Sequence, residues 1–193
     1  DRLLQVITQP EAAVGQATFL KRGNTATVMK LAGASGSWVL KRYNIKDVWH
    51  GLGRALRRSR AWISWQNAHR LELLGIATPR PLAMRENRAG PFRQGAYLVT
   101  EWSSGESLQA WLLRHGPAGI PDWLDREVSR LFTIMWLGRV SHGDMKATNL
   151  IVCGEQLQLI DLDALRRHRC KWFFKAAYGK DLQRFMDNWQ GKT

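Results

Sequence analysis

Residues that could carry out chemistry are concentrated in one short stretch, His142-Gly143-Asp144-Met145-Lys146-Ala147-Thr148-Asn149, and a further carboxylate follows at Asp161. Asp144 and Asn149 are five residues apart, and Asp161 comes twelve residues after Asn149. Phosphoryl transfer needs one carboxylate to orient the attacking hydroxyl, and a second carboxylate with an amide oxygen to hold Mg²⁺ against nucleotide phosphates. It also needs a cation on those phosphates, for which Lys41 is the candidate. These residue types and spacings predict a phosphoryl-transfer site.

The sequence around this stretch predicts how the residues are positioned. Two short strands are predicted at 149–153 and 157–162, joined by a glycine turn. Because the strands of a hairpin lie side by side, Asn149 at the start of the first and Asp161 at the end of the second would meet at one metal ion. A helix at 121–140 precedes the stretch and carries apolar residues at helical spacing.

The first half of the chain is predicted to be mainly strands, and the second half mainly helices. The strands predicted in the first half are 18–20, 27–31, 38–43, 82–84 and 97–100. The helices predicted along the chain are 45–56, 61–74, 107–115, 121–140 and 180–189. This order of elements predicts an α+β fold with a β-rich first part.

Four segments together resemble the protein-kinase-like superfamily, and within it the bacterial lipopolysaccharide core kinases that act on heptose or Kdo. His142-Gly143-Asp144 through Asn149 matches the kinase catalytic loop, with glycine in place of arginine. Val39-Leu40-Lys41 resembles the lysine motif of the third kinase strand, and residues 97–102 resemble the strand that enters the adenine-binding hinge. Ile160-Asp161-Leu162 stands where kinases have Asp-Phe-Gly. Residues 75–81 and 180–185 also resemble the framework of this family.

The resemblance implies a two-lobed fold, with a β-rich N-lobe at residues 1–101 and a mostly helical C-lobe at residues 102–193. It implies ATP and Mg²⁺ as cofactors. Asp144 would be the catalytic base, and Lys146 would contact the phosphate in transfer. Asn149 and Asp161 would hold the metal. The nucleotide would be bound by residues of the N-lobe, namely Lys41, Gly23 and Glu101.

The sequence departs from the kinase pattern at two places and leaves alternatives at others. The glycine-rich loop keeps one glycine, Gly23, and no glutamate stands near Ser64, where the partner of the strand lysine is expected. No Ala-Pro-Glu motif follows Asp161, which disfavours a protein substrate. Asp163 is the alternative metal ligand. Read singly, Lys41 and Lys146 are solvated charges, and Asp144 is a turn aspartate.

The composition is globular but strongly basic. Hydrophobic residues make up 45% and charged residues 23%, which excludes a disordered chain, and two cysteines exclude a disulfide scaffold. With 29 Lys and Arg against 16 Asp and Glu, the net charge is +13, so polyanions attract the protein. Residues 41–70 hold eight cations against Asp47, and residues 166–175 hold five cations and no acid. A generic solubilising surface is the alternative explanation.

We therefore predict an ATP-dependent kinase that phosphorylates a sugar hydroxyl of the lipopolysaccharide inner core. The predicted partners are an anionic glycan acceptor and an anionic membrane surface, and no nucleic acid is expected. No apolar run reaches the ~18 residues of a membrane span. The expected location is the cytoplasm, with peripheral contact at the cytoplasmic face of the inner membrane. The alternatives are another small-molecule kinase, of the aminoglycoside phosphotransferase type, and a nucleotide-binding pseudokinase.

Overall fold

The computed structural model describes residues 2–33, 36–44, 58–90, 92–116 and 119–189. The chain forms two compact units. The first, here called the sheet unit, comprises the chain up to Gln66 together with Arg80–Trp102. The second, the helical unit, comprises Asn67–Pro79 and the chain from Ser103 onward. The helix predicted at 45–56 lies outside the described residues.

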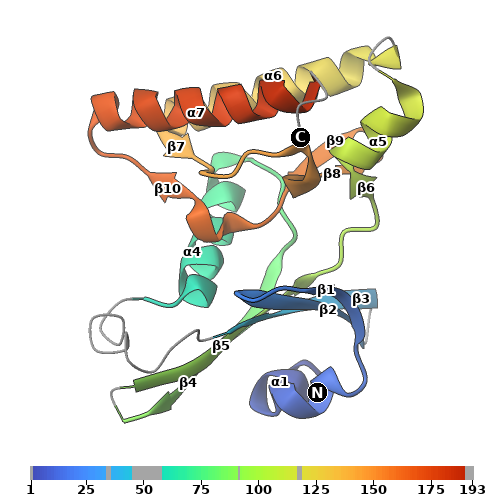
Figure 1. Cartoon of the computed structure of the whole chain (residues 1–193), viewed down its shortest axis with the longest axis vertical. Helices are drawn as coiled ribbons and strands as arrows, with labels where there is room; N and C mark the ends of the chain where they lie inside the picture. Colours follow the sequence, from blue (N-terminus) through green and yellow to red (C-terminus); the bar gives the residue numbers. More distant parts are fainter. Residues whose placement is uncertain (1, 34–35, 45–57, 91, 117–118, 190–193) are drawn as a thin grey trace. The chain divides into compact units, whose positions relative to one another are not determined.

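The sheet unit is built on one antiparallel sheet with the strand order β1-β2-β3-β5-β4 (Figure 1). All five strands predicted for the first half of the chain are present, and each is longer than predicted. Their bounds are Thr18–Arg22 (β1), Ala26–Gly33 (β2), Gly36–Tyr43 (β3), Pro81–Ala89 (β4) and Phe92–Glu101 (β5).

One face of this sheet is covered by two short helices that the sequence did not predict, α1 (Arg2–Thr8) and α2 (Pro10–Val14). Their apolar residues pack against a cluster of buried strand residues: Met29, Leu31, Trp38, Leu40, Tyr97 and Val99. Glu11 fixes α2 to the strands, because its carboxylate accepts hydrogen bonds from Arg42 (3.0 Å) and from the Tyr97 hydroxyl (2.5 Å). Burial and the neighbouring Glu11 carboxylate raise the pKa of Tyr97 to about 12.

The opposite face of the sheet packs against the start of α4 (Arg60–Leu74). Ser59 caps this helix, because its hydroxyl accepts a hydrogen bond from the Trp62 N–H (2.9 Å). The helix ends at Gly75 as predicted, in the left-handed conformation that glycine adopts readily (φ 74°). Its residues up to Gln66 belong to the sheet unit and the later ones to the helical unit.

The helical unit contains α5 (Leu108–His115), α6 (Asp122–Gly138) and α7 (Lys171–Trp189). A small sheet joins β6 (Glu106–Ser107), β8 (Leu150–Cys153) and β9 (Gln156–Leu159). A two-stranded ladder joins β7 (Val140–Ser141) to β10 (Arg166–Arg167). Apolar residues of all three helices and of β8 and β9 form one buried core. The hairpin predicted after the catalytic stretch is therefore confirmed as β8–β9.

The prediction that the last helix begins near Lys180 is wrong, because α7 begins at Lys171. The first turns of α7 are rich in aromatic residues, which are typical of strands, and Gly179 lowers helix propensity further. Packing overrides these preferences: the ring of Phe174 lies 5.2 Å from Trp136 of α6 and 5.4 Å from Tyr178. Among the described residues, no helix has both the length and the apolar composition needed to cross a membrane.

Candidate functional site

The predicted catalytic stretch forms a loop between β7 and β8 and ends in the 3-10 turn Ala147–Asn149. The loop turns at Gly143, whose φ is 83°. A Cβ atom there would lie 3.0 Å from the Ala164 carbonyl oxygen and 3.1 Å from the Ala164 Cβ. Both the backbone conformation and the close approach of Ala164 therefore favour glycine at this position.

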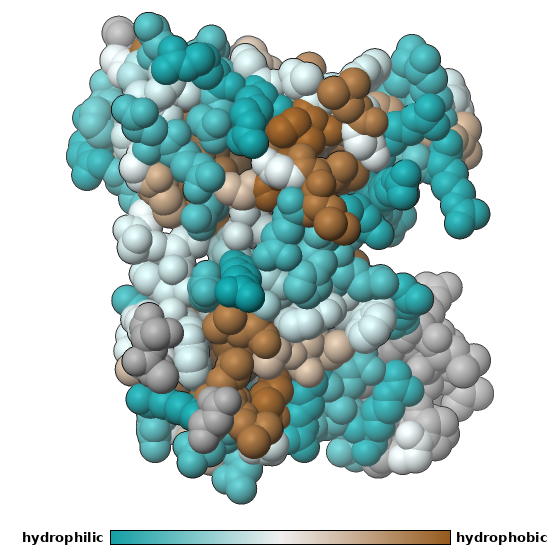
Figure 2. Space-filling model, turned by 180° about the vertical axis from the view of Figure 1, so that it is seen from behind, coloured by the Kyte–Doolittle hydropathy of each residue, from teal (hydrophilic) through white to brown (hydrophobic). Residues whose placement is uncertain are grey.

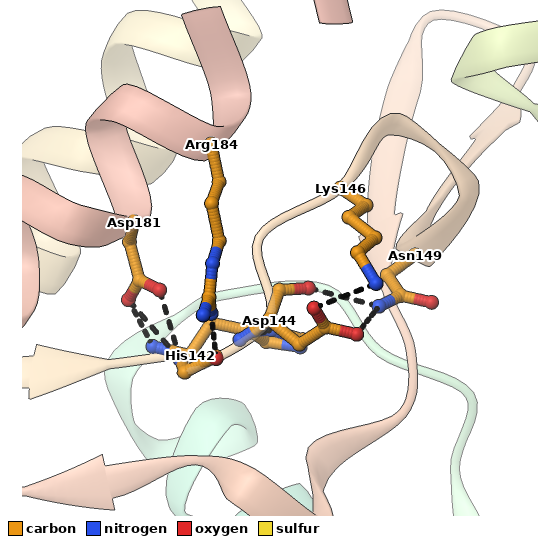
Figure 3. A network of polar contacts seen from close by, with 7 residues as sticks. His142, Asp144, Lys146, Asn149, Asp181 and Arg184 are labelled. Atoms are coloured by element: carbon orange, nitrogen blue, oxygen red, sulfur yellow. Dashed lines mark hydrogen bonds and ion pairs between the residues drawn. The ribbon is translucent and has the colours of Figure 1, made fainter. Parts of the chain in front are cut away.

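The loop brings three predicted residues into direct contact (Figure 3). Lys146 Nζ lies 3.0 Å from Asp144 Oδ1. The Asn149 amide donates to the Asp144 backbone oxygen at 2.9 Å and, more weakly, to its Oδ2 at 3.4 Å. The Asp144 carboxylate is half-buried and Lys146 is exposed, so this ion pair adds little to stability. Its lysine can move to a ligand at small cost.

Asp161 is linked to this cluster through the backbone of the residue before it. The Ile160 N–H donates to the Asn149 carbonyl oxygen at 2.9 Å, so Asp161 follows the residue that is bonded to Asn149. Strand β9 ends at Leu159, earlier than predicted, and Asp161 adopts a left-handed conformation (φ 63°, ψ 56°). For a non-glycine residue this conformation is strained, and such strain is typical of functional sites. Asp163 lies two residues further on, within the 3-10 turn Leu162–Ala164.

His142 connects the loop to the segment that carries Asp161. Its imidazole is fully buried, its Nδ1 accepts from the Asp144 N–H (3.3 Å), and its Nε2 lies 3.0 Å from the Ile160 carbonyl oxygen. This pattern requires the tautomer that is protonated at Nε2. Both ring nitrogens are therefore bonded to backbone groups, and His142 holds the two halves of the cluster together.

Asp181 of α7 is a site residue that the sequence reasoning missed. Its buried carboxylate accepts hydrogen bonds from the His142 N–H (2.6 Å) and the Gly143 N–H (2.9 Å), and Arg184 donates to the Gly143 carbonyl oxygen (Figure 3). Burial raises the pKa of Asp181, against the lowering effect of these donors. The sequence signal was the resemblance of residues 180–185 to the framework of the kinase family, which gave Asp181 no role at the site.

The oxygen donors of the cluster suit Mg²⁺, which prefers carboxylate and amide oxygens. Both hydrogen bonds that the Asn149 side chain makes to described residues come from Nδ2, so they leave the amide oxygen to face away from Asp144. Asp161 follows Ile160, whose N–H is bonded to the Asn149 carbonyl oxygen, so the backbone pairing keeps a carboxylate residue and an amide residue close in the fold. The residues present therefore fit a magnesium ion.

Lys41 belongs to the sheet unit and lies in β3, paired with Val28 of β2 and Leu98 of β5. Because side chains alternate along a strand, Lys41 and Tyr43 share the face that packs against α4. The Lys41 Nζ lies 5.0 Å from the centre of the Tyr43 ring. The Tyr43 hydroxyl is hydrogen-bonded to Ser64 Oγ at 3.0 Å, in the region where a kinase would carry its helical glutamate.

The other two predicted nucleotide-binding residues also lie in the sheet unit. Gly23 forms the turn between β1 and β2, where its N–H donates to the Ala26 carbonyl oxygen (3.0 Å). Glu101 ends β5, its N–H donates to the Arg80 carbonyl oxygen (2.9 Å), and its carbonyl oxygen accepts from Thr100 Oγ1 (3.1 Å). Since the Glu101 N–H is already bonded, a contact with adenine through this residue would use its carbonyl oxygen.

The two basic clusters differ in what their cations contact. In residues 41–70, Arg42 pairs with Glu11, Arg58 donates to Gln66, and Arg60 lies over the Tyr43 ring (5.3 Å), while 45–57 lie outside the described residues. In residues 166–175, all five Arg and Lys side chains are exposed. The second cluster is therefore the cationic surface that the structure describes in full.

Comparisons with known proteins bear on the family and the fold of the chain. A model of the lipopolysaccharide kinase (Kdo/WaaP) family matches residues 5–190. Among solved structures, the chain is similar to WaaP in complex with acyl carrier protein, with 21% sequence identity and a TM-score of 0.67. That likeness covers 92% of this chain and 73% of the other, and at this identity it concerns the fold alone. A search of curated proteins found no match.

Proposed function

Because the chain belongs to the lipopolysaccharide kinase (Kdo/WaaP) family, and is thus a kinase of protein-kinase-like fold, we propose that it transfers a phosphoryl group from ATP to a sugar hydroxyl of the lipopolysaccharide inner core. The observation that carries this proposal is the contact of Asp144 with Lys146 and Asn149, whose carbonyl oxygen is bonded to the Ile160 N–H next to Asp161 in the chain. Such a set combines a proton acceptor, a mobile cation and two oxygen donors in one place.

In this proposal Asp144 accepts the proton of the sugar hydroxyl. Its carboxylate is half-buried, and its own backbone N–H is bonded to His142 Nδ1, so the loop fixes the residue that orients the hydroxyl. Lys146, now on Asp144 Oδ1, moves to the phosphate in transfer and stabilises the charge there. The loss of this ion pair costs little, because Lys146 is exposed.

The Asn149 amide oxygen and the Asp161 carboxylate would hold Mg²⁺, which neutralises charge on the nucleotide phosphates. Asp163 is the competing ligand. In the sheet unit, Lys41 binds the phosphates of ATP, the turn at Gly23 covers them, and the Glu101 carbonyl oxygen accepts a hydrogen bond from adenine. The role of Lys41 is supported by its pairing in the centre of the sheet, opposite Leu98. The role of the Glu101 carbonyl oxygen is supported by the hydrogen bond that already occupies the Glu101 N–H.

The proposed acceptor is an anionic glycan, which the exposed cations of residues 166–175 would attract. We place the enzyme in the cytoplasm, in peripheral contact with the anionic inner-membrane leaflet, and expect no nucleic-acid partner. Acyl carrier protein, present in the similar WaaP structure, is a second candidate partner for this basic surface.

A second candidate function is that of a pseudokinase that binds nucleotide without turnover. It is favoured by one observation, namely that Ser64 occupies the region of the helical glutamate and bonds to Tyr43. The set of Asp144, Asn149 and Asp161 disfavours it. ATP hydrolysis by the purified protein in the presence of Mg²⁺ separates the two candidates.

The test of the main proposal is transfer of phosphate from ATP to purified core oligosaccharide, followed by mass spectrometry. Asp144→Asn is expected to lower turnover by roughly 10²–10⁴-fold, because general-base catalysis contributes about that much. Its ATP affinity should stay close to that of the wild type, since Asp144 faces the acceptor. An aminoglycoside acceptor serves as the control. Equal turnover in wild type and variant would contradict the base assignment, and transfer to the aminoglycoside alone would contradict the acceptor.

A further inference from the structure

The first turn of α7 exposes two aromatic rings side by side. Trp172 is 72% exposed and Phe173 is 62% exposed, and their rings meet edge to face with centroids 5.2 Å apart. Trp172 is the most exposed tryptophan among the described side chains. The next residue, Phe174, is buried, so the helix is anchored while the pair before it points into solvent. Exposed apolar groups gathered in this way mark interaction surfaces.

Exposed cations flank this aromatic pair in the sequence. Arg166, Arg167, Arg169, Lys171 and Lys175 are all exposed, and the segment from Arg166 to Lys175 contains no acid. Arg139 at the end of α6 adds a sixth cation, because its guanidinium donates to the Arg169 carbonyl oxygen (3.2 Å). Its own carbonyl oxygen accepts from the His168 N–H (2.9 Å), so the two segments are bonded in both directions. The charge of this surface is complementary to an anionic partner.

The apolar part of the surface continues onto the end of α6. Trp136 contacts the buried Phe174 ring (5.2 Å) and is itself partly exposed, and Leu137 next to it is 75% exposed. Figure 2 shows hydrophobic residues gathered on the helical unit, in the upper part of the view, with hydrophilic residues along the border. The end of α6 and the start of α7 therefore both expose apolar side chains on the helical unit.

We propose that this aromatic–basic surface, defined by Trp172, Phe173 and the cations of residues 166–175, docks the enzyme on an anionic lipid bilayer. Tryptophan is favoured at the bilayer interface, where its ring is apolar and its N–H stays hydrated. Lys and Arg extend along apolar surface while their charges reach the anionic headgroups. A bilayer takes up both kinds of group at once, whereas a free glycan offers nothing apolar for the rings. The inference rests on the proposed function, whose acceptor is carried by a lipid.

The docking surface is connected to the catalytic loop by two elements. Arg166 of β10 pairs with Ser141 of β7, the residue immediately before His142. Asp181, which holds the loop, follows Trp172 by nine residues in the same helix, about 14 Å along its axis. Docking through Trp172 would therefore keep the loop within a short distance of the headgroup region, where the inner-core sugars of a lipid-anchored acceptor lie.

The test is co-sedimentation of the full-length protein with vesicles of phosphatidylcholine alone and with vesicles containing phosphatidylglycerol. Wild type should bind the anionic vesicles, and Trp172→Ala/Phe173→Ala should weaken this binding roughly ten-fold or more. The matched control is Leu73→Ala/Leu113→Ala, which removes two side chains that are 90% and 83% exposed outside the surface. Its vesicle binding should equal that of the wild type.

A second variant separates charge from apolar contact. Replacing Arg169, Lys171 and Lys175 by Gln should reduce binding by roughly 100-fold, since each charge near an anionic surface contributes about a five-fold factor. Added salt should reproduce this loss in the wild type by screening. Thermal unfolding of each variant is measured in parallel, and Trp172→Phe is the conservative replacement that should retain most of the binding.

Activity distinguishes failure of this inference from failure of the proposed function. The Trp172→Ala/Phe173→Ala variant should phosphorylate delipidated core oligosaccharide at the wild-type rate and vesicle-embedded lipopolysaccharide at least several-fold more slowly. If the wild type transfers no phosphate to either acceptor, the proposed function is wrong. The vesicle-binding measurements then still test the docking surface. Wild-type vesicle binding by the double variant would overturn the docking surface. Absence of vesicle binding, with wild-type binding to acyl carrier protein that the double variant loses, would assign the surface to a protein partner instead.

Discussion

The residues proposed to act in catalysis are held by different physical means in the two units. In the helical unit, Asp144 lies in a loop whose backbone is fixed by hydrogen bonds to the buried side chains of His142 and Asp181. In the sheet unit, Lys41 is placed by strand register and lies against the Tyr43 ring. A group that moves a proton needs a fixed direction, which hydrogen bonds supply. A group that neutralises a phosphate needs a position, which a strand and a ring can supply.

The largest effect is expected in the helical unit, on removal of the Asp161 carboxylate. Asp161→Ala is expected to lower turnover by more than about 100-fold and to weaken Mg²⁺-dependent ATP binding, because loss of an outer-shell partner alone typically costs 10–100-fold. Asp163→Ala is the matched control and should bind ATP like the wild type. Titration of ATP with and without Mg²⁺ measures both variants. A loss in Asp163→Ala with none in Asp161→Ala would reverse the ligand assignment.

The next test removes the charge that holds the loop. Asp181→Asn is expected to lower turnover by roughly 10-fold and the free energy of unfolding by about 1–3 kcal/mol, since an amide has one acceptor oxygen and leaves one of the buried N–H groups of His142 and Gly143 unsatisfied. Asp187→Asn, on the same helix and bonded to Gln183, is the control and should be close to neutral. Steady-state kinetics and chemical denaturation measure the two effects. Wild-type kinetics in Asp181→Asn would show that the loop does not depend on this acceptor.

The raised pKa of Asp181 gives this prediction a signature in pH. Between the ordinary aspartate pKa and the raised value, the folded chain binds the proton more tightly than the unfolded chain does. The contribution of this group to the free energy of unfolding therefore rises as the pH falls. Activity should fall over the same window, because the protonated carboxyl is a weaker acceptor for the His142 and Gly143 N–H groups. In Asp181→Asn, activity should no longer fall across this pH window, because residue 181 cannot take up a proton there.

The smallest expected effect concerns the sheet unit. Tyr43→Phe removes one buried neutral hydrogen bond and should cost about 1 kcal/mol of stability, while the ring beside Lys41 remains. Its KM for ATP should therefore be unchanged. Tyr43→Leu removes the ring as well and should raise that KM by about 2–5-fold, the equivalent of a modest cation–π contact. An equal rise in both variants would mean that the hydroxyl, and not the ring, positions Lys41.

Sequence reasoning succeeded where the determinants are local. The catalytic stretch and the hairpin after it lie within about twenty residues, and the predicted hairpin is present, with the Ile160 N–H before Asp161 bonded to the Asn149 carbonyl oxygen. Asp181 could not be found in this way, because its contact with His142 spans 39 residues and depends on how α7 packs. The helices α1 and α2 were not predicted for a related reason. Helices this short are stabilised by packing against the sheet and not by the helix propensity of their own residues.

The close approach of Gly143 to Ala164 restricts how this active-site loop can evolve. Any side chain at position 143 would have to adopt φ near 83° and press on the backbone of the turn that follows Asp161. A single change of Gly143 to the arginine common in protein kinases would therefore disturb both the loop and the segment proposed to hold the metal. Changes in the loop and in the turn at Ala164 therefore depend on each other. Arginine could replace this glycine only after a change that moves Ala164 away from position 143. The identity of residue 143 is thus tied to the distance between the loop and the turn at Ala164.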